Sequence, residues 1–214
     1  MAVCLMVLLG LLMTGFQAEI IDRIAVTLDN QVITASEIAL EIRLTAFLNG
    51  DPPGFSPAAR RKAADRLIEQ KLVRREMQVG RYAQPAPDDV GPMLQQIQAQ
   101  LFHDPEEYRQ ALAKYGISED DLKAHLLWQL SLLRFIDIRF RPGVQVTDDE
   151  IHTYFDQHLS ELEKQAPAGK VTLDDVHDEI RRILTTEGVN KQLDDWLAQA
   201  RKRAHIEVHE EAFR

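Results

Sequence analysis

Two short alternating segments lie at opposite ends of a chain whose middle consists mostly of helix-forming sequence. In residues 24–28 and again in 204–208, every second residue is apolar: Ile24, Val26 and Leu28 in the first, and Ala204, Ile206 and Val208 in the second. Alternation with a period of two predicts a half-buried strand. Because an isolated pair of strands is barely stable in water, we expect the two ends to meet in one small sheet packed against helices.

The residues that follow the first strand predict a hairpin and then a helix. Asp29-Asn30 supplies residue types that tolerate turn conformations. Residues 31–33 return as a short partner strand. Thr34 and Glu37 are spaced as a capping box, in which the two side chains satisfy the first free backbone amides of a helix.

Caps and breaks divide the remaining sequence into a series of helices. Residues 49–57, NGDPPGFSP, contain too many prolines and glycines to continue a helix. Further caps and breaks predict helices at about 35–48, 57–79, 88–102, 105–115, 118–140, 147–159 and 172–200, with a candidate kink at Gly188. We therefore expect a mainly α fold with a small antiparallel sheet, formed by the N-terminal hairpin and the C-terminal strand.

Charge argues against nucleic acid as a partner. The chain has 25 Lys and Arg residues against 34 Asp and Glu residues, a formal net charge of −9 at pH 7. Sequence-independent binding to DNA needs clustered positive charge that displaces counterions. We expect no nucleic-acid partner.

The N-terminus predicts export. Residues 1–18 carry no charged side chain, and Ala18 offers a small residue before the first acid. This pattern is typical of a secretory signal peptide cleaved near Ala18. An uncleaved N-terminal membrane anchor is the alternative, because about 18 apolar residues approach the length of a membrane span. Cys4, the single cysteine, lies within this segment and can form no internal disulfide.

No motif for catalysis, metal binding or a cofactor is present. The histidines do not form a metalloprotease frame, and neither a nucleophile elbow nor a glycine-rich phosphate loop occurs. Pairs of acids such as Asp120-Asp121 fall at expected helix starts, where they act as caps and complement the helix dipole. We predict no catalytic residue, no metal site and no cofactor.

The longest predicted helix, at 118–140, is apolar on two sides. One stripe contains Leu122, Leu126, Leu130 and Leu133, and the other contains Trp128, Leu132 and Phe135. Such a helix is usually a buried central helix, but part of its surface could stay open as a binding site. Together with residues near loops and helix ends, it predicts a client-binding cleft lined by Phe47, Leu48, Phe55, Leu101, Phe102, Tyr108, Trp128, Leu132 and Phe135.

An ordered set of segments resembles the SurA-type periplasmic chaperones, relatives of the parvulin-type prolyl isomerases. The segments are IIDRIAVTLDNQVITASEI, AADRLIEQKLVRREMQVGRYAQPAPDDV, KYGISEDDLKAHLLWQLSLLRFIDIRFRPGVQVTDDEI and VTLDDVHDEIRRILTTEGVNKQLDDWLAQARKRAHIEV. They cover nearly all of the chain after residue 18. The resemblance implies a helical chaperone core, completed by the returning C-terminal segment, that binds unfolded outer-membrane or secreted polypeptides without ATP.

The family's isomerase domain has no counterpart in this sequence. In the family, one or two parvulin domains precede the C-terminal helix, whereas here only the short segment between Phe155 and Val171 stands in that place. So few residues cannot form a domain with its own core. The expected organisation is residues 1–18 as signal or anchor, 19–160 as the helical domain, 161–171 as a linker and 172–214 as the completing helix and strand.

These observations predict a periplasmic or otherwise exported holdase whose partners are unfolded polypeptides. Two alternatives remain open. The chain could be a prolyl isomerase or the accessory subunit of one, or a non-catalytic module that dimerises by exchanging its C-terminal helices. Contact with a membrane is expected only through the N-terminal segment, if that segment is not cleaved.

Overall fold

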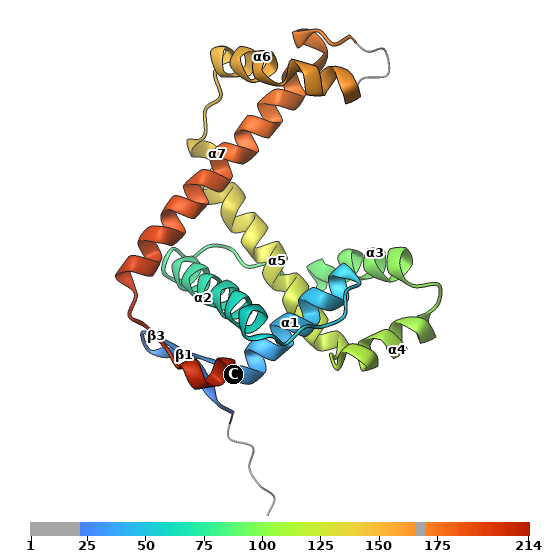
Figure 1. Cartoon of the computed structure of the whole chain (residues 1–214), viewed down its shortest axis with the longest axis vertical. Coiled ribbons are helices and arrows are strands. Elements are labelled where there is room, and N and C mark those ends of the chain that lie inside the picture. Colours follow the sequence, from blue (N-terminus) through green and yellow to red (C-terminus); the bar gives the residue numbers. More distant parts are fainter. Residues whose placement is uncertain (1–21, 166–169) are drawn as a thin grey trace, which may run out of the picture.

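The protein is described by a computed structural model that covers residues 22–165 and 170–214. In these residues, seven α-helices and one three-stranded antiparallel sheet form a mainly α fold, as the sequence predicts (Figure 1). The expected signal peptide or anchor, residues 1–18, lies outside the described residues. None of the described helices combines the length and apolar character needed to cross a lipid bilayer.

The sheet joins the two ends of the described chain. Strand β1 (Ile24–Leu28) lies between β2 (Gln31–Thr34) and β3 (Ile206–Val208) and is antiparallel to both. In the register, Val26 faces Val208 and Leu28 faces Ile206. The predicted pairing of the last strand with the first is therefore confirmed.

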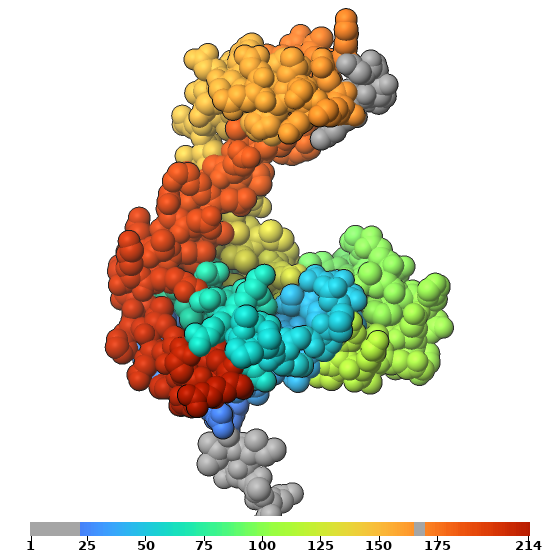
Figure 2. Space-filling model, in the orientation of Figure 1, coloured from blue at the N-terminus to red at the C-terminus, as the bar shows by residue number. Residues whose placement is uncertain are grey.

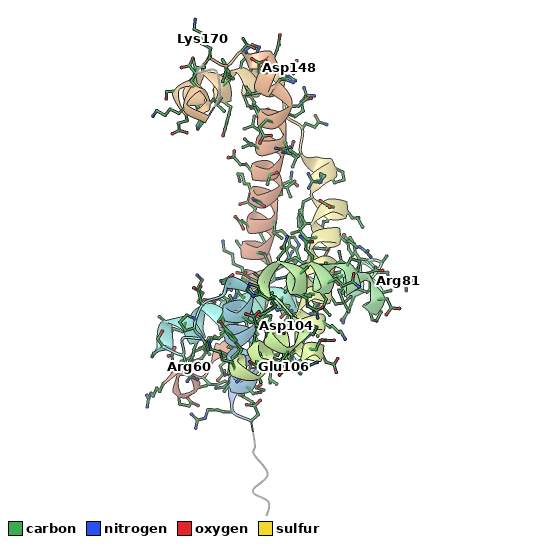
Figure 3. All side chains as sticks on the ribbon, turned by 90° about the vertical axis from the view of Figure 1, so that its right-hand side faces the viewer. Arg60, Arg81, Asp104, Glu106, Asp148 and Lys170 are labelled. Carbon is green, nitrogen blue, oxygen red and sulfur yellow. The ribbon has the colours of Figure 1, made fainter. Side chains whose placement is uncertain are left out.

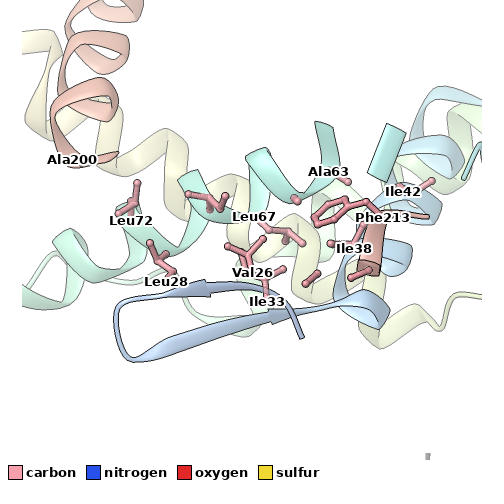
Figure 4. Packing of buried hydrophobic residues seen from close by; sticks show 14 residues of the cluster. Val26, Leu28, Ile33, Ile38, Ile42, Ala63, Leu67, Leu72, Ala200 and Phe213 are labelled. Carbon is pink, nitrogen blue, oxygen red and sulfur yellow. The ribbon is translucent and has the colours of Figure 1, made fainter. Parts of the chain in front are cut away.

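One face of the sheet packs on helix α2 (Pro57–Val79). Val26 and Ile33 are fully buried there, opposite Leu67 and Leu72 of α2 (Figure 4). Phe213, from the short 3₁₀ helix η3 (Glu210–Phe213), fills the end of this cluster and is 2% exposed. The residues after β3 thus contribute to the core as well as to the sheet.

The caps read from the sequence start several of the helices. At the start of α1 (Ala35–Asn49), the Thr34 side chain accepts a hydrogen bond from the Glu37 amide. The Glu37 carboxylate in turn accepts one from the Thr34 amide. Ser56 caps α2 by accepting a hydrogen bond from the Ala59 amide, and Asp104 caps α4 by accepting from the Glu106 and Glu107 amides. The next helices are the 3₁₀ helix η1 (Pro87–Val90), α3 (Gly91–Leu101), α4 (Pro105–Tyr115) and α5 (Glu119–Arg139).

The C-terminal half contains two helices that project away from the sheet. After the 3₁₀ turn η2 (Arg141–Gly143), α6 (Asp148–Gln165) packs on the first part of α7 (Leu173–Arg203), and α7 then returns along α2 to β3 (Figure 1). We call α6 and residues 173–188 of α7 the arm, and the remaining described residues the body. Ile151 and Ile180 are the fully buried residues of the arm.

The arm differs from the sequence-based expectation in two ways. Helix α6 continues to Gln165, beyond the predicted end near residue 159 and into the expected linker. Helix α7 runs for 31 residues through Gly188, the candidate kink, without an interruption of its helical structure. Gly188 instead allows a close approach, because a Cβ atom at this position would lie 2.7 Å from Val144 Cγ1.

Candidate functional site

A cleft of about 370 Å³ lies where helices α1, α2, α5 and α7 converge in the body. In the space-filling view, the surface of α5 is recessed between α7 and α2 (Figure 2). The apolar side chains that line the cleft come from three helices: Val73 of α2, Trp128 and Leu132 of α5, and Leu193 and Leu197 of α7. We call these five residues the floor of the cleft.

Helical spacing explains how two of these helices build the floor. Trp128 and Leu132 are four residues apart on α5, and Leu193 and Leu197 are four apart on α7, so each pair lies on one face of its helix. All four side chains are partly buried and pack against a cluster that includes Val73 and Phe135. Of the floor residues, Val73 is buried in this cluster and the other four form its partly exposed side, so the cluster supports the floor.

A polar network forms one wall of the cleft. Glu41 Oε1 accepts a hydrogen bond from Arg66 Nε at 2.8 Å and one from Thr45 Oγ1 at 3.4 Å. His125 Nδ1 lies 3.7 Å from Glu41 Oε2. The side chains of Glu41 and His125 are each only 12% exposed, so the network is largely withdrawn from water.

The tautomer of His125 follows from its neighbours. With the Gln129 amide oriented so that its Nε2 lies 3.0 Å from His125 Nε2, this ring nitrogen accepts, which assigns the proton to Nδ1, facing Glu41. Burial lowers the pKa of His125 below its ordinary value of 6.5. Glu41 opposes this decrease, and Arg66 adds to it. The lowered pKa favours the neutral form of His125.

Trp128 is held from its outer side by an arginine. The Arg74 guanidinium lies 4.5 Å from the centre of the Trp128 ring, in a cation–π contact. With the Gln70 amide turned so that its oxygen faces two donors, that oxygen accepts from Arg74 Nη2 and from Trp128 Nε1, both at 3.2 Å. The indole is therefore fixed in orientation as well as in position.

This arrangement suits the binding of apolar side chains. Glu41 is satisfied by internal partners, and the floor presents no hydrogen-bonding group other than the indole N–H, which Gln70 already occupies. No group of three or more His, Cys, Asp or Glu side chains that could hold a metal ion occurs in residues 22–165 and 170–214.

The nine residues predicted to line one cleft lie in separate places. Trp128 and Leu132 line the cleft, while Phe135 lies beneath it and is 1% exposed. Leu48 packs at the edge of a second cluster, formed around α1 and α4. Phe55 and Leu101 are exposed and do not line the cleft.

Of the three remaining predicted residues, Phe47 and Tyr108 lie inside that second cluster, and Phe102 packs against it. Phe47 stacks on Phe102 with 5.8 Å between ring centres, and Phe102 meets the Tyr108 ring edge-on at 5.4 Å. Phe47 and Tyr108 are 3% and 4% exposed. These rings partly cover one another, and Phe102 and Tyr108 also line a separate hollow of about 320 Å³, so the nine residues are not gathered around one cleft.

Several residues of the cleft were not predicted as site residues. Leu193 and Leu197 are recognisable in the sequence as an apolar helix face, but nothing there indicates that this face stays partly open. Glu41, Arg66 and His125 come from three different helices. No local pattern connects them, so only the folded structure reveals their network.

A second, larger hollow lies on the arm, between α6 and α7. Its volume is about 470 Å³, and its lining is mostly polar, with Leu184 as the apolar contribution of α7. Tyr154 and His158 stack at 4.1 Å, and His158 Nδ1 lies 2.9 Å from the Tyr154 carbonyl oxygen. This hollow lacks the apolar floor that distinguishes the cleft in the body.

The comparisons with known proteins do not extend this description. No protein-family model matches the chain, and no curated protein matches it.

Proposed function

We propose that this protein is an exported, ATP-independent holdase that binds unfolded outer-membrane or secreted polypeptides in the periplasm. The cleft between α1, α2, α5 and α7 is the proposed client-binding site. The observation that carries the proposal is the partly exposed apolar floor formed by α2, α5 and α7 beside a closed polar network. The function requires neither a nucleotide nor a cofactor.

The size of the cleft suits weak and sequence-tolerant binding. Its volume of about 370 Å³ is near the lower end of the range of about 300–1,000 Å³ for ligand pockets. Burial of two apolar client side chains would contribute about 3–6 kcal/mol before the entropy cost of ordering the client. Binding of this strength is reversible, as a holdase requires, and an apolar floor discriminates little between similar side chains.

The resemblance to SurA-type chaperones supports the same function, and the chain between α6 and α7 argues against an isomerase. Helix α6 ends at Gln165 and α7 begins at Leu173, so residues 166–172 are all that connects them. A parvulin domain with its own core cannot fit into such a short segment. A protease-coupled assay of proline isomerisation on a short peptide separates the two functions, and we expect no rate enhancement.

The decisive experiment compares the same substitution at two adjacent positions of α5. Leu132→Glu places a carboxylate on the floor, whereas Leu133→Glu changes a side chain that is 57% exposed and does not line the cleft. We measure suppression of aggregation of an unfolded β-barrel client by light scattering. We expect Leu132→Glu to require about tenfold more protein for equal protection, and Leu133→Glu to match the parent within about twofold.

A chemical block provides a second readout that does not depend on a buried substitution. The only native cysteine is Cys4, so residues 19–214 contain none. Gln129→Cys lines the cleft and can be labelled with a bulky maleimide, and Leu133→Cys is the matched control. Loss of protection on labelling at 129 but not at 133 supports the proposal. Equal protection by both labelled proteins contradicts it, as does unchanged aggregation at a molar excess of the parent protein.

A further inference from the structure

Trp128 separates the cleft from a further hollow, which lies at the end of α2 and is distinct from the hollow of the arm. This hollow has a volume of about 430 Å³ and is lined by Arg74, Met77, Arg81 and Tyr82, together with Trp128 and two glutamines. Trp128 lines both the cleft and this hollow. A polypeptide whose apolar side chains occupy the cleft can therefore place its next residues beside the two arginines.

The hollow has a basic lining in an acidic protein. No Asp or Glu lines it, although the chain carries a net charge of −9. Neighbouring cations each pair with a carboxylate of the chain: Lys71 with Glu37, Arg75 with Asp29, and Arg139 with Glu76. Among the described residues, Arg74 and Arg81 form no ion pair. Their charges are available to a ligand.

Side-chain contacts hold Arg74 in place, and the backbone turn that follows α2 positions Arg81. Arg74 is stacked on Trp128 and bonded to Gln70, which leaves the other edge of its planar guanidinium unengaged by these contacts. Arg81 has a φ of +53°, in the left-handed region, where glycine or asparagine is favoured. A left-handed residue is also a common way to end a helix, and here the Tyr82 amide donates a hydrogen bond to the Met77 carbonyl oxygen at 3.0 Å. This conformation places a cation beside the hollow at a position where glycine would be less strained.

We propose that Arg74 and Arg81 form a carboxylate-binding subsite adjoining the cleft, so that the protein prefers apolar segments followed by a carboxylate. The inference rests on the proposed client-binding function and specifies the substrate class of the same site. Guanidinium groups bind carboxylates through paired, charge-assisted hydrogen bonds, which are stronger than neutral ones. The carboxylate can come from the C-terminus of a client or from an internal Asp or Glu side chain.

The test uses the full protein and short acetylated peptides rich in leucine and serine. Isothermal titration calorimetry compares four forms: an amidated neutral peptide, the same peptide with a free C-terminal carboxylate, an amidated peptide with one internal Glu, and an amidated peptide with Lys at that place. We expect at least one carboxylate form to bind about tenfold more tightly than the neutral peptide, and the Lys form to bind more weakly. The peptide form that binds more tightly than the neutral peptide identifies the source of the carboxylate, either a C-terminus or an internal side chain.

Three variants then assign the effect to the subsite. Arg81→Gly removes the cation and relieves the backbone, so a loss of preference cannot be attributed to unfolding. Arg74→Gln removes the second cation, and Arg74→Lys keeps its charge without the planar fork. In the two neutral variants, we expect the preference for carboxylate to fall from about tenfold to within about twofold. Arg74→Lys should retain part of the preference.

Arg60→Gln is the matched control. Arg60 also lies over an aromatic ring, 5.8 Å from the centre of Phe55, but it does not line the hollow and lies on the opposite side of the body from Arg81 (Figure 3). We expect this variant to keep the full preference for carboxylate. A loss as large as that in Arg81→Gly would overturn the assignment to the subsite.

The outcomes separate this inference from the proposed function. If the neutral and carboxylate peptides bind the parent equally, the subsite is refuted while client binding stands. A preference that persists in both Arg81→Gly and Arg74→Gln refutes the subsite as well. If none of the four peptides binds, the proposed function fails and the inference fails with it.

Discussion

The body and the arm share helix α7 but are held together by very different amounts of buried apolar surface. In the body, the sheet packs on a broad cluster in which Val26, Ile33 and Leu72 are at most 2% exposed. In the described part of the arm, Ile151 and Ile180 are the only buried residues. Regions with few buried contacts open at lower free energy than the rest of a protein. We therefore expect the arm to open before the body unfolds.

The same contrast applies to the two hollows along α7. The hollow of the arm is larger, at about 470 Å³, but its lining is mostly polar and depends on two buried residues for support. The cleft of the body is smaller, at about 370 Å³, but its floor belongs to a core cluster. Volume alone does not identify the site. A supported apolar floor does.

The largest expected effect comes from the C-terminal end of the body. Phe213→Ala removes a side chain that is 2% exposed, packs in the cluster under the sheet and lies 5.6 Å from the Arg61 guanidinium. Loss of a buried phenylalanine should lower the free energy of unfolding by about 3–5 kcal/mol. Urea unfolding measures this value. A loss below about 1 kcal/mol would show that the C-terminal residues are not part of the core.

A smaller effect is expected for the polar wall of the cleft. Arg66→Met removes the 2.8 Å partner of Glu41, which is only 12% exposed, and should cost about 1–3 kcal/mol. The matched control is Arg61→Met, whose pair with Glu210 is more than half exposed and should contribute less than about 1 kcal/mol. If both variants lost equal stability, the Arg66–Glu41 pair in the wall would contribute no more than the exposed Arg61–Glu210 pair.

The third prediction concerns the arm. Ile151→Ala should expose the amides of α6 and of residues 173–188 to faster hydrogen exchange, because one of the two buried residues of the arm is lost. Unfolding followed by the fluorescence of Trp128 and Trp196, both in the body, should change by less than about 1 kcal/mol. If exchange accelerates equally in β1 and α2, the arm and the body form one cooperative unit and the contrast fails.

The smallest effect expected is a dependence on pH through His125. Burial lowers the pKa of His125 in the folded protein, so the unfolded chain binds the proton more readily. His125 therefore costs no stability well above pH 6.5, and stability falls as the pH drops from about 6.5 towards the folded pKa. His125→Gln should flatten this part of the profile.

A variant that keeps His125 but carries Arg66→Met should show a raised pKa of His125 in an NMR titration. The reason is that Glu41 raises this pKa and Arg66 lowers it.

The elements of the fold could be predicted because their signals are local. The Thr34–Glu37 capping box starts α1, and the alternation of Val26 and Leu28 marks a strand whose partner, at Ile206 and Val208, carries the same pattern. Gly188 shows the limit of such reasoning. A glycine inside a helix pattern predicts a kink, but here it makes room for Val144, a residue on a separate turn of the chain.

The candidate site could be predicted only in part. Trp128 and Leu132 stand out as the second apolar stripe of one helix, and both line the cleft. Phe47 and Tyr108 show equally apolar patterns, but both are buried in one cluster. Whether an apolar face stays open depends on which distant helices pack against it, and single-sequence patterns do not contain that information.

The measurement that tests the central claim most directly is site-specific crosslinking to a defined client. A photoreactive benzoylphenylalanine replaces Leu132 in the cleft of the body or Leu184 in the hollow of the arm. Each protein is irradiated with a purified, urea-unfolded β-barrel protein diluted out of denaturant. We predict strong crosslinking from position 132 and little from 184. Crosslinking from 184 that equals or exceeds that from 132 would contradict the assignment of client binding to the cleft.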